Sequence, residues 1–251
     1  MSNTKKYYER GLRYDGRVFD ALRSISVEYG VSRNAEGSAR VTLGTTIVYA
    51  GVKMALEKPY DDTPDRGNLM VNAELTPLAS PAFETGPPSD WAIEISRLVD
   101  RTIREGHAVD FSHLCIEEGE KVWSVMIDIV PVNDGGNLLD AASIAALAAL
   151  KDARFPTLTD GKVSYKQKGE AFTLTDMPLL ATVYKIADHL VVDPDYEEEV
   201  ESEGRVSFAV REDGTFCGIQ KGLAGAFSHD EIITAAGMAQ ETVAAYRKAI
   251  R

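Results

Sequence analysis

Hydrophobic and polar residues alternate along the first third of the chain. The segments ISVEYGVS (25–32), SARVTLG (38–44) and TTIVYAGVKMAL (45–56) are rich in Val, Ile, Thr and Tyr, and RNAEG and Gly44 separate them. Alternating β-branched and aromatic residues between turn residues are typical of strands. The pattern predicts antiparallel strands joined by tight turns, with a further strand within NLMVNAELTPLAS (68–80).

Helical periodicity follows a proline-rich loop. In WAIEISRLVDRTIREG (91–106), four aliphatic residues fall on one face when residues are placed about 100° apart: Ile95, Leu98, Val99 and Ile103. We expect Ser89 or Asp90 to cap this helix and Gly106 to end it. The pattern predicts an amphipathic helix that packs on a sheet.

The second half of the chain adds strands and two further helices. KVWSVMIDIVPV (121–132) predicts a strand buried on both faces, and LLDAASIAALAALKDA (138–153) predicts a central helix that is apolar almost all round. Segments 179–194 and 205–222 predict hairpins with turns at Ala187-Asp188 and Asp213-Gly214. A terminal helix over 228–251 begins with a capping box of Ser228 and Glu231.

This order of elements predicts an α+β protein in which long helices cover one or two sheets. A chain of 251 residues with 44% hydrophobic and 26% charged residues has the composition of an ordinary globular protein, as one large domain or two closely packed ones. No apolar stretch approaches the roughly 18 residues of a membrane span, and the first residues lack the hydrophobic segment of a secretory signal. We therefore expect a cytoplasmic protein without a membrane partner.

The charge of the chain is concentrated in one segment. The net charge is -12, and DPDYEEEVESE (193–203) carries seven carboxylates, without which 32 acidic residues face 27 basic ones. The overall charge opposes indiscriminate attraction to nucleic acid, but a local basic surface stays compatible with it. Clustered carboxylates can hold a hard cation, yet a continuous acidic run is more typical of a solvated hairpin edge or a partner-facing surface.

The sequence contains few candidate residues for catalysis or for binding a phosphate or metal. Cys115 and Cys217 lack CxxC spacing, which favours two reduced, packed thiols. The segment VNDGGNLLDAAS (132–143) has the strand, glycine loop and helix start that can hold phosphate on free N–H groups, but no Ser, Thr, Lys or Arg lies between Val132 and Ala142. The loop is therefore predicted to be a tight turn, and we expect no cofactor, no metal and no catalytic residue.

One helix carries a row of cations. Arg97, Arg101 and Arg104 have i, i+4, i+7 spacing, which places them within about 60° of one another, opposite the apolar face. Forked guanidinium donors in a row suit the phosphates of a single strand. The alternative is that each arginine makes a surface ion pair with one of the acidic residues three or four positions away: Glu94, Asp100 or Glu105.

Four segments together resemble the RNase PH family. They are GLRYDGR with FDALRSISVEYG (11–30), AEGSARVTLGTTIVYAGVK (35–53), VNAELTPLASPAFETGPP (71–88) and NLLDAASIAALAAL (137–150), and the RxDGR motif is present as Arg13, Asp15, Gly16 and Arg17. The resemblance covers nearly the whole chain and is greatest to the non-catalytic RNase PH-like subunits of archaeal exosome rings. It implies an RNase PH-like fold of two related β-α halves, as a core domain over 1–190 and a C-terminal domain over 191–251.

The resemblance also shows what this chain lacks. Active family members hold phosphate with a Gly-Ser-Arg-Thr loop, where this chain has NDGGN (133–137). The two family aspartates fall near Glu199 and Arg205, and arginines that precede the first long helix are matched by Asp90 and Trp91. Phosphoryl transfer depends on positioning and charge neutralisation, so these departures argue against intrinsic activity.

The resemblance therefore implies a non-catalytic subunit that pairs with a catalytic RNase PH-like subunit. Three such heterodimers would form a hexameric ring that carries RNA-binding cap subunits and degrades single-stranded RNA from its 3′ end by phosphorolysis. In this setting Arg97, Arg101 and Arg104 would contact the RNA, with Arg101 and Arg104 as the leading candidates. Two alternatives stay open: an active phosphate-dependent 3′ to 5′ exoribonuclease, and a homomeric RNA-binding module.

Overall fold

The computed structural model describes residues 3–159 and 162–250, in which the strands form three sheets. The N-terminal half contains α1 (Asn3–Tyr8), β1 (Ile25–Tyr29), β2 (Gly37–Leu43), β3 (Thr46–Glu57), β4 (Asn68–Ala73), α2 (Asp90–Glu105), the 3-10 helix η1 (Phe111–Leu114), β5 (Cys115–Glu117) and β6 (Lys121–Asn133). The C-terminal half contains α3 (Leu138–Asp152), β7 (Arg154–Thr159), β8 (Lys162–Ala171), β9 (Leu179–Ile186), β10 (His189–Val192), α4 (Tyr196–Val200), β11 (Gly204–Val210), β12 (Phe216–Gly222) and α5 (His229–Ala249).

The larger sheet has the order β1-β2-β3-β6-β4, with β5 added along β6. The β2–β3 turn is as tight as predicted: Leu43 pairs with Thr46, and Gly44 between them has a φ of 58° that glycine adopts at little cost. Strand β4 runs parallel to β6, whereas the other pairings in this sheet are antiparallel. The predicted strands within 25–80 and 121–132 are confirmed.

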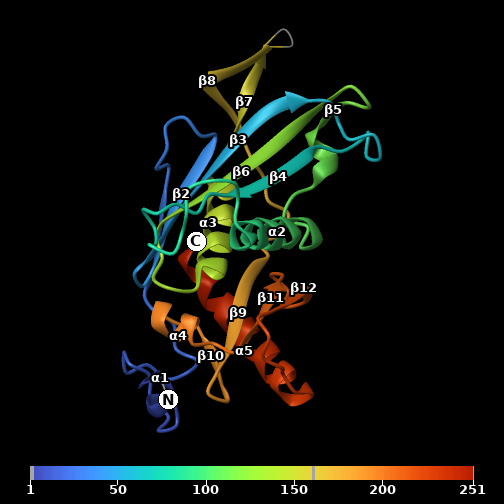
Figure 1. Cartoon of the computed structure of the whole chain (residues 1–251). Helices are drawn as coiled ribbons and strands as arrows, with labels where there is room; N and C mark the ends of the chain where they lie inside the picture. The colour runs from blue at the N-terminus through green and yellow to red at the C-terminus, as the bar shows by residue number, and fades with distance from the viewer. Residues whose placement is uncertain (1–2, 160–161, 251) are drawn as a thin grey trace.

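Helix α3 lies between this sheet and the four-stranded sheet β10-β9-β11-β12 (Figure 1). Each residue from Leu138 to Leu150 is buried, and α3 contacts β2, β3, β9 and α2. The alanines allow this close approach on all sides because they carry little side-chain volume. The prediction of a central helix is confirmed, and the protein is an α+β protein with sheets covered by long helices.

The prediction for the strand at 121–132 is wrong in one respect. Residues at alternate positions, such as Ile127 and Ile129, are buried, but Asp128 is exposed and Met126 is partly exposed. Helices α2 and α3 pack on one another and on this sheet, so they cover one face. The other face of β6 therefore reaches the surface, and apolar content alone overstated its burial.

The two predicted hairpins form the four-stranded sheet. Ala187 and Asp188 connect β9 and β10 with φ values of 47° and 65°, which match a two-residue hairpin turn. Gly214, with a φ of 83°, lies in the turn between β11 and β12. Helix α5 begins with the predicted capping box of Ser228 and Glu231 and packs on β9 and β11.

The sheet also bears on the expected domain division. Residue 190 lies within β10, and β9 is hydrogen-bonded to β11, so one sheet contains residues from both sides of that position. A core domain over 1–190 and a C-terminal domain over 191–251 stay a prediction.

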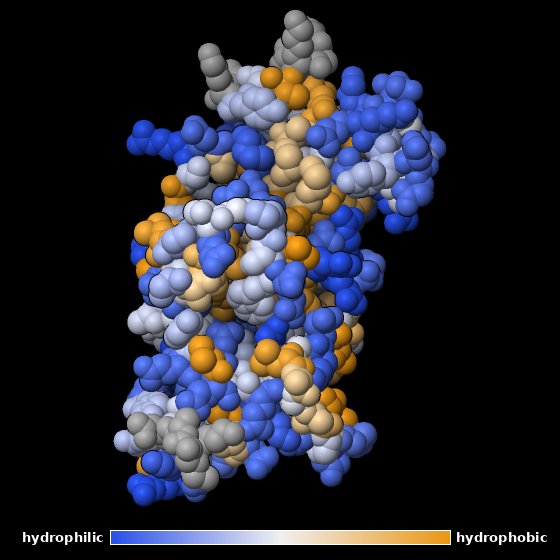
Figure 2. Space-filling model, viewed as in Figure 1, coloured by the Kyte–Doolittle hydropathy of each residue, from blue (hydrophilic) through white to orange (hydrophobic). Residues whose placement is uncertain are grey.

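The sequence pattern did not predict α1, η1, β5, α4 or the β7–β8 arm. This arm extends from the body at the end opposite α1 (Figure 1). The visible face is mostly hydrophilic, with apolar residues in small separate groups (Figure 2). Both cysteines are free and partly buried. Within the described ranges, no helix is long and apolar enough to cross a membrane.

Candidate functional site

The glycine loop between β6 and α3 has the backbone of an anion cradle, but its N–H groups already have protein partners. Gly135 N–H donates to Thr46 Oγ1 at 3.2 Å, and Gly136 N–H donates to the Asp134 carboxylate at 3.1 Å. Gly136 has a φ of 92°, and a Cβ at this position would lie 2.4 Å from the backbone of Asp195. The loop is therefore a tight turn, as predicted, that is packed against the segment following β10.

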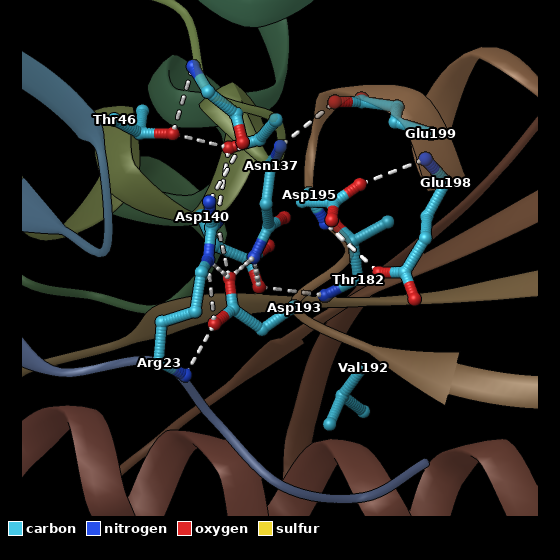
Figure 3. Close-up of polar contacts among 12 residues, drawn as sticks. Arg23, Thr46, Asn137, Asp140, Thr182, Val192, Asp193, Asp195, Glu198 and Glu199 are labelled. Carbon is cyan, nitrogen blue, oxygen red and sulfur yellow. Dashed lines mark hydrogen bonds and ion pairs between the residues drawn. The ribbon is translucent and has the colours of Figure 1, made fainter. Parts of the chain in front are cut away.

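A carboxylate of the same chain accepts a hydrogen bond at the N-terminus of α3. Asn137 N–H donates to Glu199 Oε2 at 2.8 Å (Figure 3). Tyr184 donates its hydroxyl to Glu199 Oε1 at 2.9 Å. A negative group is stabilised at a helix N-terminus, where a bound phosphate would otherwise be favoured. Burial nevertheless raises the pKa of Glu199, and its two hydrogen bonds oppose that rise.

The side chain of Asn137 is directed into the interior. Asn137 adopts a left-handed conformation with a φ of 59°, and its Nδ2 lies 3.1 Å from both Asp140 Oδ2 and Asp193 Oδ1 (Figure 3). Asp140 also accepts hydrogen bonds from Thr182 N–H at 3.2 Å and from the Tyr246 hydroxyl at 3.0 Å. Burial raises the pKa of Asp140 to about 7, although these hydrogen bonds act against it.

One cation, Arg23, contacts this loop, but its guanidinium donors already bind groups of the protein. Arg23 donates to the carbonyl oxygens of Gly135 and Gly136 at 2.7 and 3.1 Å, and it forms a 2.6 Å ion pair with Asp193. Asp193 is fully buried and also receives Arg17 at 3.4 Å. Arg23 therefore fixes the loop to the β10–α4 connection, and Asp193 balances its charge.

The prediction of a solvated edge for the acidic run 193–203 is wrong for Asp193 and Glu198, although Glu197 and Glu203 are exposed. Asp193 and Glu198 are fully buried, and Asp195 forms a capping box with Glu198 at the start of α4. Burial opposes the ionisation of Glu198, but the hydrogen bonds and charge of Arg13 outweigh it and lower the pKa of this carboxyl. Among the described residues, no group of three or more His, Cys, Asp or Glu side chains could hold a metal ion.

The RxDGR motif supplies the cation for this run. Arg13 binds Glu198 through Nε at 2.9 Å and Nη2 at 2.6 Å, and it also donates to the carbonyl oxygens of Val192 and Asp193. Tyr8 donates its hydroxyl to the same carboxylate at 2.8 Å. Residues about 185 positions apart are thus joined in the interior. The local signal that could have revealed α4 is the Asp195-x-x-Glu198 capping pattern.

The structure separates the three arginines of α2. Arg97 and Arg101 are exposed and line a groove of about 330 Å³ between α2 and β12, to which Gln220 also belongs. Arg104 instead forms an ion pair with Asp100 at 2.8 Å and donates to the Leu69 carbonyl at 2.6 Å. The ion-pair alternative thus describes Arg104, whereas within the described ranges Arg97 and Arg101 form no ion pair.

Arg205 contacts two residues near the start of α2, Glu94 and Trp91. Its guanidinium forms an ion pair with Glu94 at 2.6 Å and lies 4.6 Å from the centroid of the Trp91 ring. Glu94 therefore pairs with Arg205 instead of with Arg97, although Glu94 and Arg97 line the same groove. The two positions where the resemblance expects an aspartate and an arginine, Arg205 and Trp91, form a cation–π pair here.

The comparisons with known proteins agree with this fold. Two profiles match, described as the 3′ exoribonuclease family, domain 1, over residues 21–156 and domain 2 over residues 176–242. The exosome complex component Rrp42 of Methanothermobacter thermautotrophicus is 43% identical over 234 residues, which cover 92% of this chain and 86% of that protein. The Rrp42 of Methanopyrus kandleri is 41% identical and covers 96% of this chain and 91% of its own length.

Solved structures give the same result. A chain of the Archaeoglobus fulgidus exosome with RNA bound to the active site superposes with a TM-score of 0.92 at 38% identity, covering 99% of this chain and 96% of that one. Rice Rrp46, at a TM-score of 0.69 and 18% identity, shares the fold. The chain therefore belongs to the 3′ exoribonuclease family, which is the RNase PH family.

Proposed function

We propose that this chain is a non-catalytic subunit of an archaeal exosome ring. It structures the active site of a neighbouring catalytic RNase PH-like subunit and helps to hold single-stranded RNA during 3′ to 5′ phosphorolytic degradation. Its similarity to archaeal Rrp42 proteins and to a chain of an RNA-bound exosome supports this function.

One observation supports the non-catalytic part of the proposal: Glu199 accepts the hydrogen bond of the Asn137 N–H at the start of α3. Phosphorolysis needs an inorganic phosphate held on free donors and neutralised by cations. In this loop Thr46 and Asp134 take the two preceding N–H groups, and Arg23 is balanced by Asp193. A phosphate at this place would meet the Glu199 carboxylate and be repelled by it.

The RNA-holding part depends on the groove beside α2. Arg97 and Arg101 are exposed, one helical turn apart, and neither forms an ion pair within the described ranges. Guanidinium groups on one rim of a groove suit successive phosphates of a single strand. Arg104 contributes by orienting the helix, since its donors are used by Asp100 and Leu69.

The proposed partners follow from the same assignment. The chain pairs with the catalytic subunit as a heterodimer, three heterodimers close into a hexameric ring, and RNA-binding cap subunits join the ring. We place the complex in the cytoplasm. The net charge of -12 is compatible with this assembly because a large part of the surface then faces protein instead of free RNA.

Reconstitution tests the proposal. The chain is co-expressed with a candidate catalytic RNase PH-like subunit, the complex is sized, and phosphorolysis of a single-stranded RNA is measured with each subunit omitted. We expect a ring that releases nucleoside diphosphates, and no release from this chain alone. Release of nucleoside diphosphates by the purified single chain would support an active exoribonuclease instead. A closed homomeric ring that excludes the catalytic partner would support a homomeric RNA-binding module.

A further inference from the structure

A second basic surface lies at the base of the β7–β8 arm. A notch of about 120 Å³ forms where the arm meets the loop before β2, and it is lined in part by Arg33, Asn34, Arg154, Phe155, Tyr165 and Lys168. The lining residues that the structure describes for this notch and for the groove beside α2 are different. The arm extends from the body at one end of the molecule, whereas α2 lies near mid-height (Figure 1).

The cations of this notch are not neutralised. Arg33 and Lys168 are exposed and form no ion pair within residues 3–159 and 162–250. Arg154 is also exposed, and its Nη1 donates to the Gly169 carbonyl at 3.3 Å. One exposed carboxylate, Glu170, lies on the same strand as Lys168. Three positive charges thus gather within a chain whose net charge is -12.

Among the described residues that line the notch, the one carboxylate is already balanced. Glu36 is 7% exposed, accepts the Lys53 ammonium at 2.8 Å and accepts the Met54 N–H at 2.9 Å. Its negative charge is therefore neutralised by Lys53 and stabilised by the backbone of β3. An anion that enters the notch meets three cations, and no free carboxylate competes among the lining residues that the structure describes.

An aromatic ring completes the surface. The Tyr165 side chain is 54% exposed, and Lys53 Nζ lies 4.9 Å from its ring centroid. The cation on one side of the ring holds it in place and leaves aromatic surface available for stacking. Cations beside an exposed aromatic ring are the combination that binds single-stranded nucleic acid, with phosphates on the cations and a base on the ring.

We propose that this notch binds one backbone phosphate and one stacked base of a single-stranded RNA, as a contact site separate from the arginine groove. The notch is small enough for a phosphate group and too small for the side-chain clusters that anchor a folded protein. The site goes beyond the proposed function, because it acts on the isolated chain and needs no ring.

The test uses the full chain with Arg97→Gln/Arg101→Gln as background, so that the arginine groove does not contribute. A 12-nucleotide oligouridylate with a 5′ fluorophore is the probe, and anisotropy is measured over a salt series. We expect Arg33→Gln/Lys168→Gln to weaken binding about tenfold and to reduce the log–log salt slope by about 0.7, because the one phosphate bound in the notch contributes about 0.7 on a single strand. Tyr165→Leu should weaken binding about fivefold or more, since a stacked base is lost, without a change in salt slope.

A matched control removes the same charge elsewhere. Lys6 in α1 and Arg10 just after it are exposed, and α1 lies at the end of the molecule opposite the arm (Figure 1). Lys6→Gln/Arg10→Gln should leave affinity within twofold. Crosslinking with a 4-thiouridine oligonucleotide should label the peptide that contains Tyr165.

Unchanged affinity and salt slope in both the charge variant and Tyr165→Leu would overturn the proposal. Binding of a polyglutamate peptide that depends on the same residues, with no RNA binding, would also overturn it and indicate a protein-docking surface. These outcomes are independent of whether the chain is catalytic, so the proposed function and this site fail by different measurements.

Discussion

Glu199 Oε2 accepts a hydrogen bond of 2.8 Å from the backbone N–H of Asn137, a residue 62 positions earlier in the chain. This contact closes the N-terminus of the central helix α3 with a carboxylate that is part of the polypeptide. A tethered carboxylate is present at this position in every folded molecule, whereas free phosphate has to be captured from solution. The fold thus retains the turn and helix of an anion cradle, with its own side chain in the anion position.

Removal of this carboxylate should destabilise the chain. Glu199→Ala leaves the Asn137 N–H and the Tyr184 hydroxyl without their acceptor, so we expect a loss of about 2 to 3 kcal/mol in the free energy of unfolding. Glu199→Gln keeps one amide oxygen for Asn137 and should lose about 1 kcal/mol. Urea unfolding measures both. Equal stability of Glu199→Ala and the parent chain would contradict the assigned contact.

The buried pair of Arg13 and Glu198 should dominate the attachment of the N-terminal segment. Both side chains are fully buried and 2.6 Å apart, so Arg13→Ala leaves an unpaired carboxylate in the interior and should cost about 3 to 5 kcal/mol. Arg13→Lys retains a charge but loses the fork to the carboxylate, and it provides an intermediate case if the alanine variant does not fold. Arg10→Ala, at an exposed position, is the control and should change stability by less than about 0.5 kcal/mol. A mild effect of Arg13→Ala, close to that of the control, would rule out this role.

Stability should depend on pH through Asp140. Its pKa is about 7 in the folded chain, against an ordinary value of 3.8, so the folded state binds the proton more tightly than the unfolded state. The corresponding stabilisation is fully present below pH 4 and is lost as pH rises through about 7, with a magnitude on the order of 4 kcal/mol.

Asp140→Asn removes this titration and keeps an oxygen for the donors of Thr182 and Tyr246. We expect the stability of the variant relative to the parent chain to rise between about pH 4 and pH 7 and to level off above pH 7. The raised pKa of Glu199 acts in the same direction in both proteins and cancels in the difference. Parallel stability curves over this range would show that Asp140 does not titrate there.

Substitution of the three arginines of α2 should affect two different quantities: Arg104 the stability of the chain, and Arg97 and Arg101 its RNA affinity. Arg104→Gln loses the hydrogen bond to the Leu69 carbonyl and the ion pair with Asp100, so it should lower the free energy of unfolding by about 1 kcal/mol. Arg97→Gln and Arg101→Gln should leave stability within about 0.5 kcal/mol. In the ring reassembled with the catalytic subunit, each of these two should weaken RNA binding and reduce the salt slope by about 0.7.

An Arg101→Glu/Arg104→Glu double variant places a negative charge in the groove at position 101 and removes the contacts of Arg104 with Asp100 and Leu69, so it should weaken RNA binding by the ring further. Unchanged RNA affinity of this variant and of Arg97→Gln in the ring would remove the arginine groove from RNA recognition. Normal affinity with lowered stability would assign the arginines to the packing of α2 alone.

The sequence by itself determined the elements whose information is local. The period of Ile95, Leu98 and Ile103 defines the buried face of α2, the continuous apolar pattern of 138–150 predicts the central position of α3, and Gly44 marks a two-residue turn. Each signal depends on residues within one or two turns of one another, which is the range over which periodicity and turn chemistry act. The resemblance to the RNase PH family and the departures at 133–137 could likewise be read from adjacent residues.

Only the tertiary structure decided which charged side chains are buried and which partners they bind. The acidic run looks like a solvated surface in sequence, but Arg13, Arg17 and Arg23, more than 160 residues away, meet Asp193 and Glu198 in the interior. Arg97 and Arg104 share one helix face, yet Asp100 and Leu69 near the start of β4 bind Arg104 and leave Arg97 in the groove. A charged side chain is buried when a partner offsets the cost of leaving water, and that partner is supplied by the fold instead of by the neighbouring residues.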